Sequence, residues 1–225
     1  MRSARAVVLG VTVAGVLGLV LVSLLQRTSL AFTPGVARAA AVARLAPGEQ
    51  VCQRPIDVPS GAAFDRIAVG VGTYGAAGSP LRLTVRTASG RPLASGTLAG
   101  GYPDVARRPV ERVRLDRSVG AGRISVCVEN RGPRRVGVFG DADLAARAST
   151  AVEDGRPLRR DLSLVFERPS KSMASEVPAM LSRAALFRFP GMGAWAYVLL
   201  GALLLLAGPW LLIRAVAAAS GDDRG

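Results

Sequence analysis

The chain has 225 residues, half of them hydrophobic, and its 29 lysine and arginine side chains outnumber its 16 acidic ones to give a formal charge of +13. It contains no histidine, which excludes imidazole metal ligands and imidazole bases. With 20% charged and 5% aromatic residues, the composition is not that of a disordered tail, so the apolar residues must be concentrated in particular segments.

The first apolar segment, 6–25, is uncharged and has the length that a helix needs to cross a bilayer core of about 30 Å. Arg2 and Arg5 precede it and place residues 1–5 in the cytoplasm under the positive-inside tendency. A signal peptide, cleaved near Ala31, is the alternative. Small residues at every fourth position favour a retained helix that packs on another, although such spacing also arises by chance. These residues are Ala6, Gly10, Ala14 and Gly18.

Beyond this segment, residues 26–46 are mostly small and are expected to form a linker. In 47–168 the pattern changes to short runs in which apolar and polar residues alternate, as strands with one buried face require. About eight such runs, separated by turn residues and without helical patterns between them, predict a mainly β fold, an antiparallel β-sandwich. The expected strands are 49–53, 64–71, 81–86, 92–98, 110–115, 124–129, 135–139 and 162–166.

Cys52 and Cys127 are the two cysteines of the chain, and both lie in expected strands. In an extracytoplasmic domain, which folds under oxidising conditions, a disulfide between them is the default. Two separate buried thiols are the alternative. A metal site is disfavoured because structural zinc sites usually have four ligands and no histidine is present.

After the sandwich, residues 169–193 are expected to form a polar spacer and a short interfacial helix. The second apolar run, 194–213, predicts another transmembrane helix with Trp195 and Trp210 near its ends and a small-residue seam that includes Gly201 and Gly208. The tail 214–225 would then share the cytoplasmic side with the N-terminus. Neither tail is long enough for a catalytic module.

Two short motifs suggest chemistry that their surroundings do not support. The string 70–75 matches a dinucleotide-binding turn, but no helix is expected after it to receive a pyrophosphate. The pair Asp141 and Asp143 resembles the carboxylates that hold a divalent ion in some glycosyltransferases, and equally suits the cap of a short helix. No cofactor and no metal centre are therefore predicted, and these two aspartates are the residues that would hold an ion if one bound.

Two tyrosines outside the second apolar run, Tyr74 and Tyr102, lie in glycine-rich turns. A ring on a loop can stack on a sugar while polar neighbours bond to the sugar hydroxyls. Asp104, Arg86 and Asn130 would be those neighbours. The alternative is that the rings fold back on the end of the sandwich.

Adjacent arginines precede three of the expected strands. Guanidinium groups suit phosphates and carboxylates, so the pairs are candidate anion-binding residues, with a solvated surface as the alternative. An outward-facing basic domain suits acidic polymers or lipid headgroups better than nucleic acid. The pairs are Arg107 and Arg108, Arg134 and Arg135, and Arg159 and Arg160.

The layout resembles the membrane-tethered extracytoplasmic β-domains that accompany glycan synthesis in the actinobacterial cell envelope. The strand pattern is similar to that of the galactose-binding-like jelly roll, on the segments 47–52, 81–87 and 124–132. The resemblance concerns the fold more than the function, because this fold has enzyme, adhesion and accessory members.

Together these features predict a non-catalytic protein of the plasma membrane, with two spans, both termini cytoplasmic and the sandwich outside. It would dock on an envelope glycan or anionic polymer, or on a membrane partner such as a glycan-synthesis protein or a second copy of itself. The alternatives are an envelope enzyme that uses carboxylates alone and a sensory subunit of a signalling complex.

Overall fold

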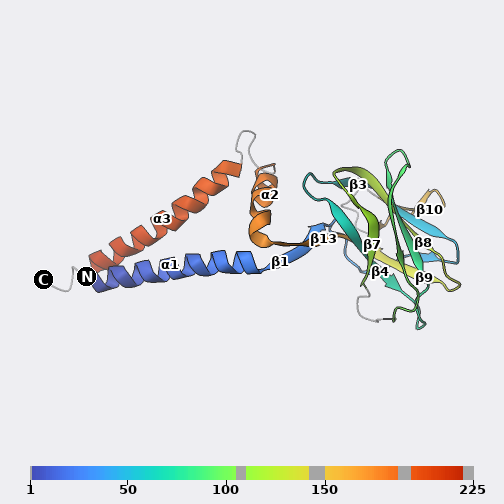
Figure 1. Cartoon of the computed structure of the whole chain (residues 1–225), viewed down its shortest axis with the longest axis horizontal. Coiled ribbons are helices and arrows are strands. Elements are labelled where there is room, and N and C mark those ends of the chain that lie inside the picture. Colours follow the sequence, from blue (N-terminus) through green and yellow to red (C-terminus); the bar gives the residue numbers. More distant parts are fainter. Residues whose placement is uncertain (1, 105–109, 142–149, 187–193, 220–225) are drawn as a thin grey trace. The chain divides into compact units, whose positions relative to one another are not determined.

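The computed structural model describes residues 2–104, 110–141, 150–186 and 194–219 (Figure 1). The chain divides into two compact units, one made of Met1–Thr28 with Ser170–Gly225 and the other of Ser29–Pro169.

Two antiparallel sheets build the unit Ser29–Pro169, which confirms the mainly β, sandwich-like fold. The seven-stranded sheet has the order β1-β13-β4-β9-β12, with β2 beside β9 and β7 beside β4, and the six-stranded sheet has the order β11-β10-β3-β8-β5-β6. The strands are β1 (Arg27–Phe32), β2 (Ala40–Leu45), β3 (Gln50–Val58), β4 (Phe64–Gly72), β5 (Leu81–Thr87), β6 (Pro92–Leu98), β7 (Val110–Val119), β8 (Gly122–Asn130), β9 (Val136–Asp141), β10 (Thr150–Glu153), β11 (Arg156–Pro157), β12 (Asp161–Leu162) and β13 (Leu164–Ser172).

Alternation along the strands builds the core between the sheets. In β5 the side chains of Leu81, Leu83 and Val85 are fully buried and Arg82 between them is exposed, because successive side chains of a strand point to opposite faces. Aromatic rings fill the interior at one place, where Phe32 stacks on Phe166 with ring centroids 4.3 Å apart.

The segment 26–46 was expected to be a linker. It instead contains the strands β1 and β2, which both belong to the seven-stranded sheet. Ala43 and Leu45 of β2 are buried, and β2 pairs with β9. Alanine-rich strands show little contrast between their two faces, so periodicity does not reveal them. The short strands β10 and β11 were also not expected, and the expected strand 162–166 is divided between β12 and β13.

The predicted disulfide is confirmed. Cys52 on β3 and Cys127 on β8 are register partners, their Cα atoms are 3.9 Å apart, and their sulfur atoms are bonded. The bond therefore ties two neighbouring strands of the six-stranded sheet. Successive side chains of a strand point to opposite faces, so the sulfur atoms lie on the face opposite Val51 and Val128, which belong to the core.

Three helices belong to the other unit: α1 (Arg2–Leu25), α2 (Met173–Leu186) and α3 (Ala194–Ala219). Among the described residues, one helix is long and apolar enough to cross a membrane, over Trp195–Ala215 of α3, with a mean hydropathy of 2.2. The guanidinium of Arg214 lies 4.6 Å from the ring centre of Trp210.

Two membrane spans were expected, one on each side of the sandwich. Among the described residues, only one helix is long and apolar enough to be a span. The described apolar part of α1, Gly10–Leu25, is shorter than the roughly 20 residues that a span needs. The region after the sandwich also differs from the expected spacer, because β13 continues to Ser172 and α2 begins at Met173.

The predicted helix-packing residues face open space within the described chain. A Cβ atom added to Gly10, Gly18, Gly201 or Gly208 would meet nothing within 4 Å, and Ala6 and Ala14 of the same ridge are exposed. The three helices contact one another, but no atom of another helix lies within 4 Å of a Cβ added at these glycines.

Candidate functional site

The outer face of the seven-stranded sheet has a floor of glycines where β4 meets β9. Val71 pairs with Val138 and Gly72 with Gly137 across the two strands. Both valines are buried in the core, so alternation turns the glycines to the outer face. At these positions the sheet presents backbone without side chains of its own.

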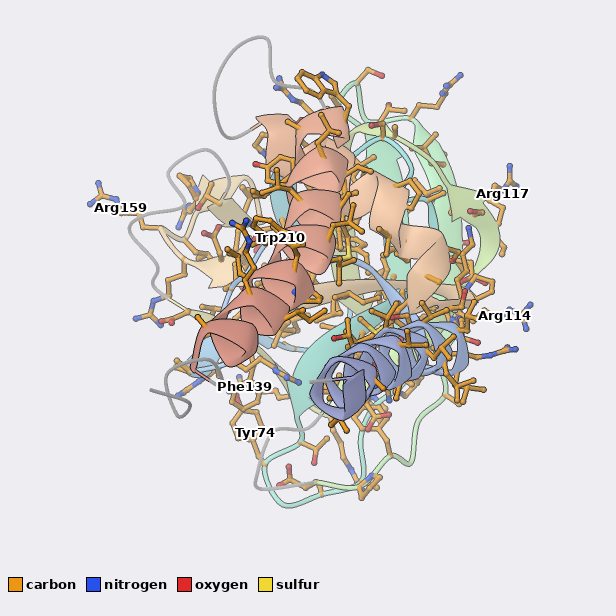
Figure 2. All side chains as sticks on the ribbon, turned by 90° about the vertical axis from the view of Figure 1, so that its left-hand side faces the viewer. Tyr74, Arg114, Arg117, Phe139, Arg159 and Trp210 are labelled. Carbon is orange, nitrogen blue, oxygen red and sulfur yellow. A yellow bond between two sulfur atoms is a disulfide. The ribbon has the colours of Figure 1, made fainter. Side chains whose placement is uncertain are left out.

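Two aromatic residues lie over this floor. A Cβ at Gly72 would stand 2.7 Å from Cε2 of Phe139, and a Cβ at Gly137 would stand 3.0 Å from the hydroxyl of Tyr74. Glycine is therefore needed at position 72 for Phe139 to lie where it does, whereas a Cβ at position 137 would require the Tyr74 hydroxyl to shift by a few tenths of an ångström. Tyr74 and Phe139, which we call the ring platform, are labelled in Figure 2.

The tyrosine of the platform is held in an unusual conformation. Tyr74 has a φ of 54°, in the left-handed region that residues with a side chain seldom adopt, and its side chain is 57% exposed. The Asp104 carboxylate accepts hydrogen bonds from the backbone N–H groups on both sides, at 3.3 Å from Thr73 and 2.5 Å from Gly75. A carboxylate on another segment thus fixes the turn that presents the ring.

The same hydrogen bonds change the acidity of the carboxyl group. The N–H of Gly75, and next that of Thr73, lower the pKa of Asp104 because they stabilise its charged form. Asp104, expected to bond a sugar, has both carboxylate oxygens engaged by the turn.

A cationic side chain lies beside the platform. A Cβ at Gly70 would stand 3.1 Å from Cδ of Arg38 and 3.0 Å from Cβ of Phe139, so the two side chains share this glycine. Arg38 is exposed. Its guanidinium offers up to five N–H donors at the end of this side chain.

Chemically, the ring platform suits the recognition of a polar ring. Aromatic faces contact the apolar C–H surface of a sugar, and the tyrosine hydroxyl and an arginine supply hydrogen bonds at its edge. The platform offers groups that can contact a ring, and Tyr74, Phe139 and Arg38 do not include the two carboxyl groups that glycoside hydrolysis uses.

Tyr102, the second tyrosine expected to stack on a sugar, lies in the core. Its side chain is 8% exposed and packs against Gly78, where a Cβ would overlap the ring. Burial, and next the charge of Glu111, raise the pKa of Tyr102 to about 12.

Asn130 is also internal. It is fully buried, and its amide donates to the backbone carbonyls of Leu45 at 3.0 Å and Arg134 at 2.7 Å while its carbonyl accepts from the N–H of Gly132 at 3.0 Å. The side chain thereby ties the end of β8 to the following turn and has no surface for a ligand.

The remaining predicted site residues are dispersed. Arg134, Arg135, Arg159 and Arg160 are exposed, whereas Arg107, Arg108 and Asp143 lie outside the described residues. Asp141 pairs in register with Asp161 in the sheet. Over the described parts of the chain, no group of three or more acidic or cysteine side chains could hold a metal ion.

Phe139 and Arg38 were missed because neither belongs to a motif. The available signal was the glycine spacing in 70–75, where Gly70 and Gly72 are two residues apart and so share one face of a strand. Glycines on one face of a strand indicate that other groups approach the backbone closely.

The fold defines the protein as a two-sheet antiparallel β-sandwich joined to a helical unit whose described residues include one candidate membrane span. Models of known protein families give no match to the chain, and no curated protein is significantly similar to it.

Proposed function

We propose that the protein is a non-catalytic, membrane-anchored binding protein whose sandwich docks on a glycan of the cell envelope through the ring platform. The observation that carries the proposal is the conformation of Tyr74, which is exposed and has a positive φ. Left-handed backbone costs roughly 1–2 kcal/mol for a residue with a side chain, and an exposed ring recovers little of this by burial. A strained, exposed aromatic residue supports a role in contacting a ligand.

The membrane part of the proposal rests on α3 and extends to α1. The helix α1 runs over Arg2–Leu25, and its basic N-terminal residues favour a cytoplasmic start. With α1 as a second span, both termini lie in the cytoplasm and the sandwich lies outside. The disulfide supports an oxidising surrounding for the sandwich.

The open glycines of α1 and α3 support a second element of the proposal. Because a Cβ at Gly10 or Gly201 meets nothing within 4 Å, these faces remain free for close approach by another helix. We propose that this helix belongs to a membrane-protein partner or to a second copy of the chain.

Retention of the detergent-solubilised full chain on immobilised envelope polysaccharide tests glycan docking. The variants Tyr74→Ala and Phe139→Ala should each weaken retention about fivefold, as expected for the loss of one aromatic contact. Tyr102→Phe is the matched control, because it removes a tyrosine hydroxyl from the interior and leaves the platform intact. Unchanged retention of both platform variants would refute the proposal.

A further inference from the structure

The outer face of the six-stranded sheet carries a groove of about 600 Å³. The disulfide between Cys52 and Cys127 lies in its wall, and Arg54 and Arg86 also line it. This face belongs to the sheet that does not carry the ring platform, so the groove is a separate feature of the molecule.

Register places a row of polar side chains across four strands of this sheet. Thr150 on β10 is the partner of Arg54 on β3, and Arg86 on β5 is the partner of Ser125 on β8. The register between β3 and β8 shifts between Gln53 and Ile56, so the irregular stretch that holds Arg54 faces Ser125. The two arginines thus flank a serine, on strands about 10 Å apart.

The charges of these two arginines are not neutralised within the described structure. Some arginines of the sandwich have acidic partners, such as Arg112 with Glu167 and Arg123 with Asp57, both at 3.0 Å. For Arg54 no such partner occurs among the described residues. The guanidinium of Arg86 donates a long hydrogen bond, 3.4 Å, to the backbone carbonyl of Gly90.

The composition of the groove wall supports the same conclusion. No acidic residue is found among the described residues that line it, whereas hydroxyl and amide groups are contributed by Ser125, Thr150, Thr87 and Gln50. Hydroxyl and amide groups can bond to the hydroxyls of a ligand, and guanidinium groups bond to its acidic groups in a bidentate manner.

A second hollow of about 550 Å³ shares Thr87 and Ile124 with the groove and adds the side chain of Arg91. The two hollows therefore adjoin, and arginines line both of them. Adjoining basic hollows suit an extended chain with repeated acidic groups better than a single small ion.

We propose that this groove binds the carboxylate groups of an acidic polysaccharide, with Arg54 and Arg86 each holding a carboxylate and Ser125 bonding to a sugar hydroxyl between them. The inference adds a second site to the proposed glycan-binding function and does not depend on the ring platform. Its ligand is defined by charge, whereas stacking at Tyr74 does not require a charged sugar.

The test measures binding of tetragalacturonate, an acidic oligosaccharide, to the full chain in nanodiscs of neutral lipid. Arg54→Gln and Arg86→Gln should each weaken binding about tenfold, as expected when a charged hydrogen-bond donor is lost. Arg114→Gln is the matched control, since Arg114 is an exposed arginine of β7 in the other sheet. Ser125→Asp should abolish binding without altering either arginine, because it places a carboxylate between the two guanidinium groups.

Three other measurements separate the outcomes. Maltotetraose, which is neutral, should not compete with tetragalacturonate, and neither should vesicles of phosphatidylglycerol. Equal losses in Arg114→Gln, competition by maltotetraose, or competition by the vesicles would each overturn the proposal, the last in favour of a lipid surface. Tyr74→Ala should leave tetragalacturonate binding unchanged, so failure of the platform and failure of the groove give different patterns.

Discussion

The ring of Phe139 lies against the backbone of Gly72 on the neighbouring strand, and a Cβ at position 72 would stand 2.7 Å from Cε2 and 3.3 Å from Cζ of that ring. The arrangement is reciprocal, because the hydroxyl of Tyr74, two residues beyond Gly72, lies at Gly137, two residues before Phe139. Gly72 and Gly137 are register partners. Each aromatic side chain of the platform thus reaches the glycine of the other strand.

Gly72→Ala should displace Phe139 and weaken retention on envelope polysaccharide to the level of Phe139→Ala. The added methyl group is too close to the ring, so the ring must move, at a cost of about 1–3 kcal/mol in the free energy of unfolding. Chromatographic retention and thermal unfolding measure the two effects. Gly120→Ala is the control, since a Cβ there meets nothing within 4 Å. Normal retention of the Gly72→Ala variant would show that the position of the Phe139 ring is irrelevant to binding.

Asp104→Ala should release the turn that presents Tyr74 and weaken retention as much as Tyr74→Ala, because both hydrogen bonds to the turn are lost. The lowered pKa of Asp104 also gives an acid dependence. A carboxyl group whose pKa is lower in the folded chain than in the unfolded chain stabilises the fold. This stabilisation is fully present above the unfolded pKa, near 4, and disappears as the pH falls through the folded pKa. Retention of the native chain should therefore decline below about pH 4.

If retention of the Asp104→Asn variant also declined in acid, the acid dependence would come from other carboxyl groups. The amide of asparagine does not titrate, so its variant should show a weaker but flat retention over the same pH range. Retention measured at several pH values for both chains distinguishes the two results.

Tyr102→Phe should make the fold more resistant to alkali. The pKa of Tyr102 is raised to about 12 in the folded chain. The resulting contribution to the stability of the fold is complete below the unfolded pKa of about 10 and is lost as the pH rises from 10 to the folded pKa. Its hydroxyl is buried without a hydrogen-bond partner among the described residues, so its removal should not reduce stability at neutral pH. Denaturant unfolding at pH 7 and pH 11 compares the chains, and parallel losses in both would contradict the assignment.

Replacement of both cysteines, Cys52→Ala with Cys127→Ala, should lower the free energy of unfolding by about 4–5 kcal/mol in the chain-entropy model. The reason is that the bond joins residues 75 positions apart and restricts the unfolded chain. Urea unfolding of the oxidised chain and of the variant measures the difference. An equal midpoint for the two would show that pairing of β3 with β8 does not depend on the bond.

Thiol labelling of intact cells should distinguish one span from two. Both native cysteines are joined, so an introduced cysteine is the only reactive one. An impermeant maleimide should label Ser170→Cys, at the exposed end of β13, on intact cells and label Ser3→Cys only after permeabilisation. Labelling of Ser3→Cys on intact cells would contradict the assignment of α1 as a membrane span. If the mature protein lacked the introduced cysteine altogether, residues 6–25 would be part of a cleaved signal peptide.

The sequence alone determined the secondary structure wherever hydrophobic contrast is strong. Alternation over 81–86 predicted β5, the apolar run 194–213 predicted the helix that contains the candidate span, and the two cysteines in expected strands predicted the disulfide. The strand and the helix depend on residues that are close together in the chain. The disulfide depends on a single pair of cysteines, for which few alternatives to pairing exist. Where contrast is weak, as in the alanine-rich strand β2, the same reasoning predicted a linker.

Only the tertiary structure decided which polar and aromatic side chains reach the surface together. Periodicity assigns a residue to one face of a strand, but it does not say which strands are neighbours or what covers that face. Asn130 and Tyr102 were therefore expected at a ligand and lie in the interior, while Phe139 joins Tyr74 through the pairing of β9 with β4. The same long-range pairing places Arg54 and Arg86 on one groove across β8, because strand neighbours are selected by burial of the whole core rather than by local sequence.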